Sequence, residues 1–159
     1  MDISNQGLDL IKDSESLRLE AYLDTGGVPT IGYGTTRIDG KPVKMGMKIN
    51  EEQAEQYLRA DVKSSVEAVN KLVKVEITQH QFDALVDFVY NVGEHAFETS
   101  TLLRELNSGN ADDVQHQLLR WNKDNGKVQK GLTRRRLKEA VLFGPRSRQT
   151  LIDDYGLDV

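Results

Sequence analysis

The chain has 159 residues, 38% of them hydrophobic, a formal net charge of −4 and no cysteine. This is the length of one domain with enough apolar content to bury a core, and the absence of cysteine excludes disulfides, zinc–thiolate sites and thiol nucleophiles. No apolar run approaches the roughly 18 residues of a membrane span, and the N-terminal sequence MDISNQGLDLIKDSE lacks the features of a signal peptide, so we expect no stable membrane insertion.

The first predicted element is a short helix that ends near a glutamate. Ser4 or Asn5 can cap this helix, and Leu8 and Ile11 lie on its apolar face. The helical spacing ends near Glu15, so this carboxyl group is expected at the negative end of the helix dipole.

Two hairpins are predicted after this helix. Residues 19–24 alternate between apolar and polar side chains as a strand does, and residues 28–33 return as a second strand after a turn at 25–27. Asp39-Gly40 predicts a second hairpin turn, and Pro42 suits an exposed edge strand. The N-terminal region is therefore expected to carry a small antiparallel sheet.

The rest of the chain predicts helices. Two of them begin with a capping box, a polar residue followed three positions later by glutamine, at Asn50 and at Thr78. Asn110 is expected to begin another helix, Thr133 to cap the last one, and Gly144-Pro145 to end it. We therefore predict a single α+β domain. Its parts are a sheet-bearing lobe at about 13–49, a connecting helix at 50–74, a helical lobe at 78–144 and a tail at 145–159.

Three oxygen-bearing side chains have a spacing that suits glycosidic-bond chemistry. Glu15 ends the first helix, while Asp24 and Thr30 lie in the hairpin that follows. Cleavage of a glycosidic bond uses one carboxylic acid that protonates the leaving oxygen and one carboxylate on the other side of the sugar. Taken singly, a glutamate or aspartate is commonest on a solvated surface and a threonine is common in strands. Their combination with the run TIGYGTT favours a glycosidase site.

No cofactor or metal is expected from the remaining side chains. The three histidines are scattered along the chain without the spacing of metal ligands. They are His80, His95 and His116.

The pattern E-x8-D-x5-T followed by IGYGTT resembles the active-site motif of the phage-type lysozymes, glycoside hydrolase family 24. Three further segments are similar to helices of that family: QFDALVDFVYNVG at 81–93, RWN at 120–122 and GLTRRRLKEAVLF at 131–143. The resemblance covers about residues 8–144 in order, and the tail after 144 has no counterpart.

The resemblance implies a lysozyme-like fold and a muramidase. Such an enzyme hydrolyses the β-1,4 bond between N-acetylmuramic acid and N-acetylglucosamine in peptidoglycan and lyses the host cell at phage release. It also implies that Glu15 is the general acid and that Thr30 is the hydroxyl that holds a water. Asp24 would be the carboxylate that positions or activates this water or stabilises the oxocarbenium-like charge.

Supporting residues also follow from the resemblance. Arg135 falls where the family places an arginine that pairs with carboxylates beside the catalytic glutamate, although Arg134 and Arg136 leave this register open by one residue. Thr35 stands where some members carry a histidine, so the ion pair of those members is not expected here. Three residues are expected to bind substrate: Gly34, Tyr90 and Asn91.

The charge is unevenly distributed. Residues 120–148 contain ten Lys or Arg and two acidic residues, a net charge of +8, so the remainder carries −12. This segment predicts either a basic face that meets the anionic cell wall or an ordinary solvated helix face. Nucleic acid is the rival partner, but Trp121 and Phe143 are expected in the core rather than as stacking platforms, so no nucleic acid partner is predicted.

Two other readings use the same residues. A wall-binding protein that has lost its chemistry is disfavoured by the intact Glu15, Asp24 and Thr30. A lytic transglycosylase would use the glutamate alone, and the presence of the other two residues favours hydrolysis. The stereochemical outcome, inverting or retaining, stays open, as does the choice between a free endolysin, a prophage product and a cell-puncturing device.

We expect a monomer that is made in the host cytoplasm. It would reach the periplasmic peptidoglycan glycan strands only after another factor, such as a phage holin, permeabilises the membrane.

Overall fold

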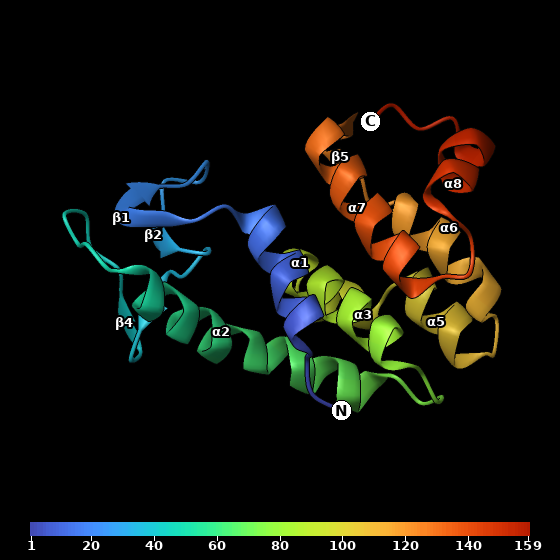
Figure 1. The fold of residues 1–159 in the computed structure, drawn as a ribbon, viewed down its shortest axis with the longest axis horizontal. Helices are drawn as coiled ribbons and strands as arrows, with labels where there is room; N and C mark the ends of the chain where they lie inside the picture. Colours follow the sequence, from blue (N-terminus) through green and yellow to red (C-terminus); the bar gives the residue numbers. More distant parts are fainter. The chain divides into compact units, whose positions relative to one another are not determined.

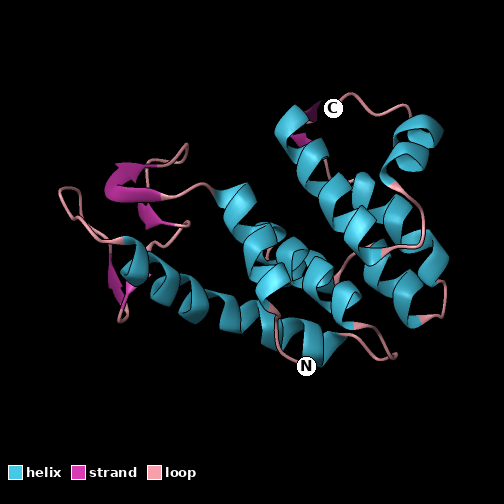
Figure 2. Cartoon of the chain, viewed as in Figure 1, coloured by secondary structure: helices cyan, strands magenta, loops and turns pink.

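The computed structural model describes residues 1–159 and is mainly helical (Figure 1, Figure 2). The helices are α1 (Asn5–Glu15), α2 (Glu51–Leu72), α3 (Gln79–Val92), α4 (Glu94–Glu98), α5 (Thr101–Asn107), α6 (Val114–Leu119), α7 (Lys130–Phe143) and α8 (Arg148–Tyr155), with a 3-10 turn η1 (Ala111–Asp113). The strands are β1 (Arg18–Leu23), β2 (Pro29–Gly32), β3 (Arg37–Ile38), β4 (Lys41–Pro42), β5 (Lys123–Asp124) and β6 (Lys127–Val128). They pair in sequence order as small antiparallel sheets, which confirms the predicted α+β class.

The chain forms two compact units, one of residues 9–64 and one of residues 1–8 and 65–159. Both boundaries fall inside helices, so α1 and α2 each contribute residues to both units. None of the helices combines the length and the apolar character that a membrane-spanning segment needs.

The unit of residues 9–64 is built on the two predicted hairpins. Its core consists of Ala21, Ile31 and Val43, all buried, with further aliphatic side chains packed against them. The predicted Asp39-Gly40 turn is confirmed: both residues have positive φ, 52° and 77°, and they join β3 to β4. Two successive positive φ angles match the twist of an antiparallel pair, which explains why this dipeptide makes the turn.

The start of α1 is held by a buried carboxylate. Ser4 caps the helix through its Oγ, which accepts the Gly7 N–H at 3.2 Å. Asp83 on α3 is fully buried and accepts the Ser4 N–H at 3.0 Å and the Gln79 side-chain amide at 2.8 Å. The predicted cap is therefore confirmed at Ser4.

Both predicted capping boxes are present. At the start of α2, the Asn50 and Gln53 side chains accept each other's backbone N–H groups, at 2.8 and 3.0 Å. Thr78 and Gln81 make the same reciprocal pair before α3. These bonds use backbone donors that have no partner inside the helix, which is why the sequence pattern locates the helix start.

The core of the larger unit lies where α3 packs on α7 and α7 packs on α6. Every residue from 82 to 89 of α3 is buried. The Phe88 ring meets Phe97 and Trp121 edge to face, with ring centroids 6.2 and 5.4 Å apart. Phe143 is 5% exposed, which confirms that it belongs to the core, whereas Trp121 is half-buried and packs on Phe88.

Two predicted helix starts differ in the structure. The helical segment does begin after Asn110, but as the 3-10 turn η1 that leads into α6, and the Asn110 side chain makes no cap because its amide donates to Glu105 at 2.8 Å. Thr133 lies inside α7, which begins at Lys130. Its hydroxyl oxygen accepts a hydrogen bond from the Asn122 amide at 3.1 Å. The oxygen that was predicted to cap a helix therefore makes a tertiary contact instead.

A hairpin, β5–β6, and a helix, α8, lie where no element was predicted. Asn125-Gly126, both with positive φ, join β5 to β6 in a hairpin directly before α7. The predicted tail contains α8, which Ser147 caps by accepting the Thr150 N–H at 3.3 Å.

Gly7 provides a test of packing at the start of α1. A Cβ placed there would lie 2.6 Å from Ile3 Cγ1 and 2.8 Å from Asp83 Cγ, so Gly7→Ala should lower the free energy of unfolding by about 1–3 kcal/mol. Gly131→Ala on α7 is the matched control: no atom lies within 4 Å of its added methyl, and helix propensity should raise stability by about 0.5 kcal/mol. Urea unfolding of both variants is the measurement, and a Gly7→Ala protein as stable as wild type would contradict this packing.

Candidate active site

Glu15 is the last residue of α1 and is half-buried. Ser16 follows in the left-handed conformation, with φ of 53°, which ends the helix directly after the glutamate. The compact unit of residues 9–64 holds Glu15 together with Asp24 and Thr30.

Asp24 follows β1, and its carboxylate organises the turn toward β2. Oδ1 accepts the backbone N–H groups of Gly26 at 2.9 Å and of Val28 at 2.8 Å. The Asp24 carbonyl accepts the Gly27 N–H at 2.9 Å. Because both side-chain hydrogen bonds use Oδ1, Oδ2 stays available to a ligand.

Thr30 lies opposite Tyr22 in the β1–β2 pair and is 4% exposed. Its Oγ1 donates to the Val28 carbonyl at 2.9 Å, and the same carbonyl accepts the Asp24 N–H at 3.0 Å. The Thr30 proton is thus used inside the hairpin, while the lone pairs of Oγ1 can accept a hydrogen bond from water. A single residue, Val28, couples Asp24 to Thr30 through its backbone.

Gly34 lies in a tight loop directly after β2. Ile31 and Thr35 close this loop with two backbone hydrogen bonds of 2.9 Å each. Gly34 has φ of 96°, a conformation that favours glycine. The loop after β2 therefore turns at Gly34, a residue without a side chain.

Thr35 makes a hydrogen bond to a carboxylate of α2. Its Oγ1 donates to Asp61 Oδ2 on α2 at 2.6 Å, and Thr35 is 1% exposed. Burial raises the pKa of Asp61, and the hydrogen bond from Thr35 opposes this rise. Thr35 is thus a neutral hydrogen-bond donor at the position where a histidine was considered in the sequence analysis.

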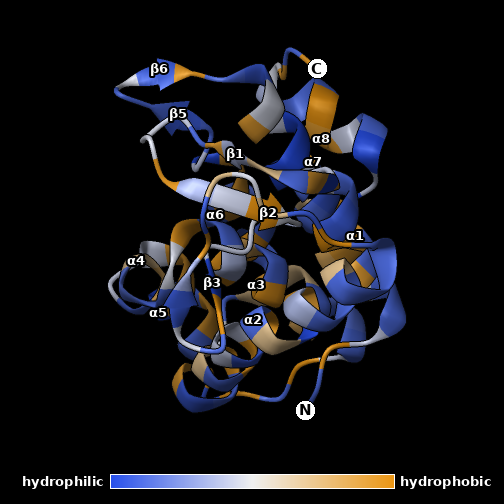
Figure 3. Ribbon diagram, turned by 90° about the vertical axis from the view of Figure 1, so that its left-hand side faces the viewer, coloured by the Kyte–Doolittle hydropathy of each residue, from blue (hydrophilic) through white to orange (hydrophobic).

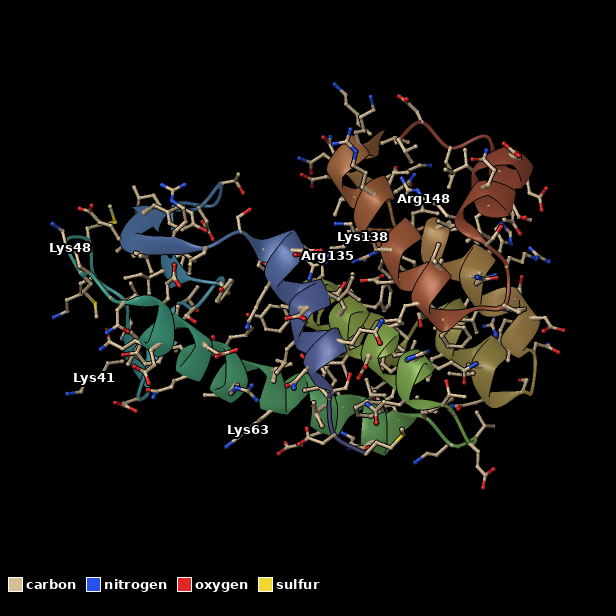
Figure 4. The ribbon with its side chains drawn as sticks, in the orientation of Figure 1. Lys41, Lys48, Lys63, Arg135, Lys138 and Arg148 are labelled. Carbon is tan, nitrogen blue, oxygen red and sulfur yellow. The ribbon has the colours of Figure 1, made fainter.

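Arg135 lies on α7 (Figure 4) and is 7% exposed. Its guanidinium donates two hydrogen bonds to Asp87 of α3, from Nε to Oδ2 at 3.1 Å and from Nη2 to Oδ1 at 2.9 Å. Burial by itself raises the pKa of Asp87, but the hydrogen bond with Glu139 and the charge of Arg135 outweigh it and leave this pKa below its usual value. Arg134, one of the two alternatives in register, is exposed, and Arg136 has different partners.

Arg136 and Glu139 are fully buried beside this pair. Arg136 Nη2 donates to Glu139 Oε2 and to Asn91 Oδ1, both at 2.9 Å, and the guanidinium lies over the Phe88 ring. Asn91, which was expected to bind substrate, gives its carbonyl oxygen to this network and keeps its amide N–H groups for other partners. Tyr90 is half-buried at the same end of α3.

The predicted site residues divide between the two compact units. The smaller unit carries Glu15, Asp24, Thr30 and Gly34, and the larger unit carries Tyr90, Asn91 and Arg135. No three histidine or acidic side chains converge as the ligands of a metal ion would.

Sequence reasoning missed Val28, Asp87 and Glu139. Val28 acts through its backbone, for which the side chain gives no signal. Asp87 could have been found from the sequence, because a charged residue within a run of apolar residues on α3 is expected to be buried and to need a partner. Glu139 follows Arg135 by four positions, the spacing of neighbours on one helix face.

A family model described as phage lysozyme matches residues 12–139, most of the chain. The chain belongs to the phage lysozyme family. This match confirms the family that the E-x8-D-x5-T motif and the three helical segments predicted.

Individual members of the family are similar over nearly the same region. An endolysin from Bacillus phage B103 is 49% identical over 145 residues, which are 90% of this chain and 54% of the relative. This chain therefore spans about half the length of that phage protein. Among solved structures, the endolysin from Escherichia coli O157:H7 phage FAHEc1 is 53% identical with a TM-score of 0.85, covering 90% of this chain and 93% of that one. The muramidase domain of SpmX from Asticaccaulis excentricus is 38% identical with a TM-score of 0.82, covering 91% of this chain and 99% of that one.

The Thr35–Asp61 hydrogen bond leads to a pH-dependent prediction. The pKa of Asp61 is raised in the folded state, so its contribution to stability is full below its unfolded pKa and is lost as the pH rises through its folded pKa. Thr35→Val removes the donor to the ionised carboxylate and should cost about 1 kcal/mol at neutral pH, a small value because Asp61 is only half-buried. The difference from wild type should shrink as the pH falls and Asp61 takes up its proton.

Urea unfolding at a series of pH values from about 4 to about 7 measures this difference. Thr36→Val, at the exposed neighbouring position, is the matched control and should leave stability unchanged. A Thr35→Val defect of equal size at both ends of the series would contradict the role of the Asp61 charge.

Proposed function

We propose that this chain is a muramidase that hydrolyses the β-1,4 bond between N-acetylmuramic acid and N-acetylglucosamine in bacterial peptidoglycan. The observation that carries the proposal is the coupling of Asp24 and Thr30 through Val28, in the compact unit that also contains Glu15. Membership of the phage lysozyme family supports it, as do the names endolysin and muramidase of its relatives.

In this proposal, Glu15 protonates the leaving glycosidic oxygen. The Asp24 carboxylate is fixed by the two N–H groups on Oδ1 and uses Oδ2 to position water or to stabilise positive charge at the anomeric carbon. The Thr30 hydroxyl already donates to Val28, so a water bound to it would donate a hydrogen bond to Oγ1 and keep a lone pair for attack on the sugar.

The supporting residues are proposals as well. Arg135, anchored by Asp87, is the arginine that supports the catalytic glutamate. Gly34, Tyr90 and Asn91 bind the glycan, with Gly34 allowing close approach of the sugar to the backbone.

A lytic transglycosylase is the alternative reaction on the same substrate. It would form an anhydro product without added water, and it would have no use for a water held by Thr30. The orientation of the Thr30 hydroxyl therefore favours hydrolysis.

The first functional prediction concerns Glu15. Glu15→Gln removes the transferable proton and should reduce wall lysis by about 10²-fold or more while the protein stays folded. Clearing of bacterial cell-wall suspensions measures lysis, and mass analysis of the fragments should find hydrolysed rather than anhydro ends for wild type. Glu20→Gln, an exposed glutamate on β1, is the matched control and should retain full activity. Wild-type lysis by Glu15→Gln would refute the assignment.

We further propose that a basic stripe helps this enzyme to meet an anionic wall. The stripe consists of Lys127 on β6 and Lys130, Arg134 and Lys138 on α7, all exposed. Residues four positions apart share one helix face, with about 6 Å of rise between them. Lys138 is labelled in Figure 4, and the β5–β6 hairpin is mainly hydrophilic in Figure 3. Arg135 and Arg136, by contrast, are buried, so they do not add to this surface charge.

Salt dependence tests the stripe. Lysis by wild type should fall as salt rises past physiological strength, because exposed charges are screened over about 8 Å at that ionic strength. Reversing two charges, Lys127→Glu with Lys130→Glu, should weaken lysis at low salt and flatten this dependence. Lys41→Glu with Lys63→Glu makes the same change of net charge at exposed positions outside the stripe (Figure 4). Equal flattening by both pairs would show that net charge, and not the stripe, attracts the enzyme to the wall.

Delivery and assembly complete the proposal. We propose that the protein acts as a monomer on periplasmic peptidoglycan, and that a membrane-permeabilising factor such as a holin gives it access from the host cytoplasm.

A further inference from the structure

Arg18 is the first residue of β1 (Figure 1), and its side chain is exposed. The central carbon of its guanidinium lies 4.4 Å from the centroid of the Tyr22 ring, four residues further along the chain. A guanidinium over the face of a tyrosine is attracted by the negative charge of that face. The Tyr22 ring therefore holds this cation at a defined place on the surface of the smaller unit.

The contact places Arg18 next to the hairpin of the proposed catalytic residues. Tyr22 lies directly opposite Thr30 in the β1–β2 pair. Residues directly opposite in an antiparallel pair have their side chains on the same face, with Cβ atoms about 5 Å apart. Ala21 and Ile31, the chain neighbours of Tyr22 and Thr30, belong to the core of the unit, so the row of Arg18, Tyr22 and Thr30 lies on the other face.

Arg18 differs from the other two arginines of the smaller unit. Arg37 donates to the Gly40 carbonyl at 2.9 Å, and Arg59 lies 3.8 Å from Glu55. The Arg18 guanidinium makes no hydrogen bond and no ion pair within the chain, and the ring is its partner. A ring contacts the face of a guanidinium, whereas the five N–H donors lie in its plane. These donors are therefore available to an anion that the chain itself does not supply.

We propose that Arg18 is a specificity-determining residue that binds a carboxylate on the muramic acid side of the substrate. The proposal rests on the proposed function, in which the cleaved bond joins N-acetylmuramic acid to N-acetylglucosamine. Muramic acid differs from glucosamine by a lactyl group, whose carboxyl is either free or joined to a short peptide with carboxylates of its own. The planar fork of an arginine matches the two oxygens of a carboxylate, which a glucosamine unit lacks.

The distances along the row suit such a substituent. The step from Thr30 to Tyr22 and the 4.4 Å from the ring to Arg18 place the cation on the order of 10 Å from the hydroxyl that is proposed to hold water. An extended peptide spans about 3.3–3.6 Å per residue. A lactyl group, or a peptide of two or three residues that begins at it, can therefore carry a carboxylate from the reacting sugar to Arg18.

A purely structural role for Arg18 is the competing explanation. In that case the guanidinium covers the Tyr22 ring and contacts no substrate. Loss of Arg18 would then change all substrates alike. The two explanations are separated by substrates that differ only in their carboxylates.

Three preparations of glycan strands provide this comparison: strands with their peptides, strands stripped of peptides so that the lactyl carboxylate is free, and strands with peptides whose carboxylates are converted to neutral methylamides. We expect Arg18→Gln to raise KM about three- to tenfold on carboxylate-bearing strands, with kcat within about twofold of wild type. On the methylamide strands, Arg18→Gln and wild type should have the same KM. An effect confined to peptide-bearing strands assigns the carboxylate to the peptide, and an effect that persists on stripped strands assigns it to the lactyl group.

Four further variants test the fork, the ring and the net charge. Arg18→Lys keeps the charge without the planar fork and should recover only part of the wild-type KM. Tyr22→Phe keeps the ring and should leave KM unchanged, whereas Tyr22→Leu removes it and should raise KM as Arg18→Gln does. Arg59→Gln makes the same change of net charge at an exposed position on α2 and is the matched control.

A binding measurement on the full chain does not depend on activity. In nitrogen-15 spectra of the Glu15→Gln protein, the Arg18 Nε signal should shift when peptide-bearing strands are added and stay in place with methylamide strands. An Arg18→Gln protein whose KM equals that of wild type on all three preparations, or rises equally on all three, would overturn the inference, as would an equal rise in Arg59→Gln. A carboxylate-dependent shift of Arg18 in a protein whose wild type cleaves none of the strands would refute the proposed function alone.

Discussion

The Arg135–Asp87 pair is the interaction that the larger unit depends on most, because both charges lie away from water. Loss of one partner from a buried pair leaves an uncompensated charge and costs about 3–5 kcal/mol. The pair joins α7 to α3, the two helices that form the centre of this unit. Arg136 and Glu139 surround it with further charge, so the interior of this unit is held by electrostatics as well as by aromatic packing.

The smaller unit positions its polar groups by a different device. Its hairpin uses backbone hydrogen bonds at Val28 to hold Asp24 and Thr30, so the two side chains depend on turn geometry and not on ion pairs. This arrangement fixes the two proposed site residues while Asp24 Oδ2 accepts no hydrogen bond within the hairpin. It also places a buried threonine, a residue common in strands, where its hydroxyl has a defined donor direction.

The Thr35–Asp61 hydrogen bond joins the loop after β2 to α2. Thr35 supplies a neutral donor to a half-buried carboxylate, so the loop after β2 is tied to α2 without a second charge. The cost is that Asp61 remains ionisable with a raised pKa.

The sequence by itself determined the features that depend on neighbouring residues. The capping boxes at Asn50 and Thr78, the Asp39-Gly40 turn and the end of α7 at Gly144 are local, because the groups that bond are a few residues apart. The motif that contains Glu15, Asp24 and Thr30 was readable for the same reason, since it lies within one helix and one hairpin.

Only the tertiary structure decided which polar groups become partners across the chain. Thr133 was predicted as a cap but meets Asn122, and of the three consecutive arginines Arg135 is the one that reaches Asp87 from α7. The Arg135–Asp87 pair joins two residues that are 48 positions apart in the sequence. Burial and long-range pairing set such energies, and a local pattern of residues carries no information about either.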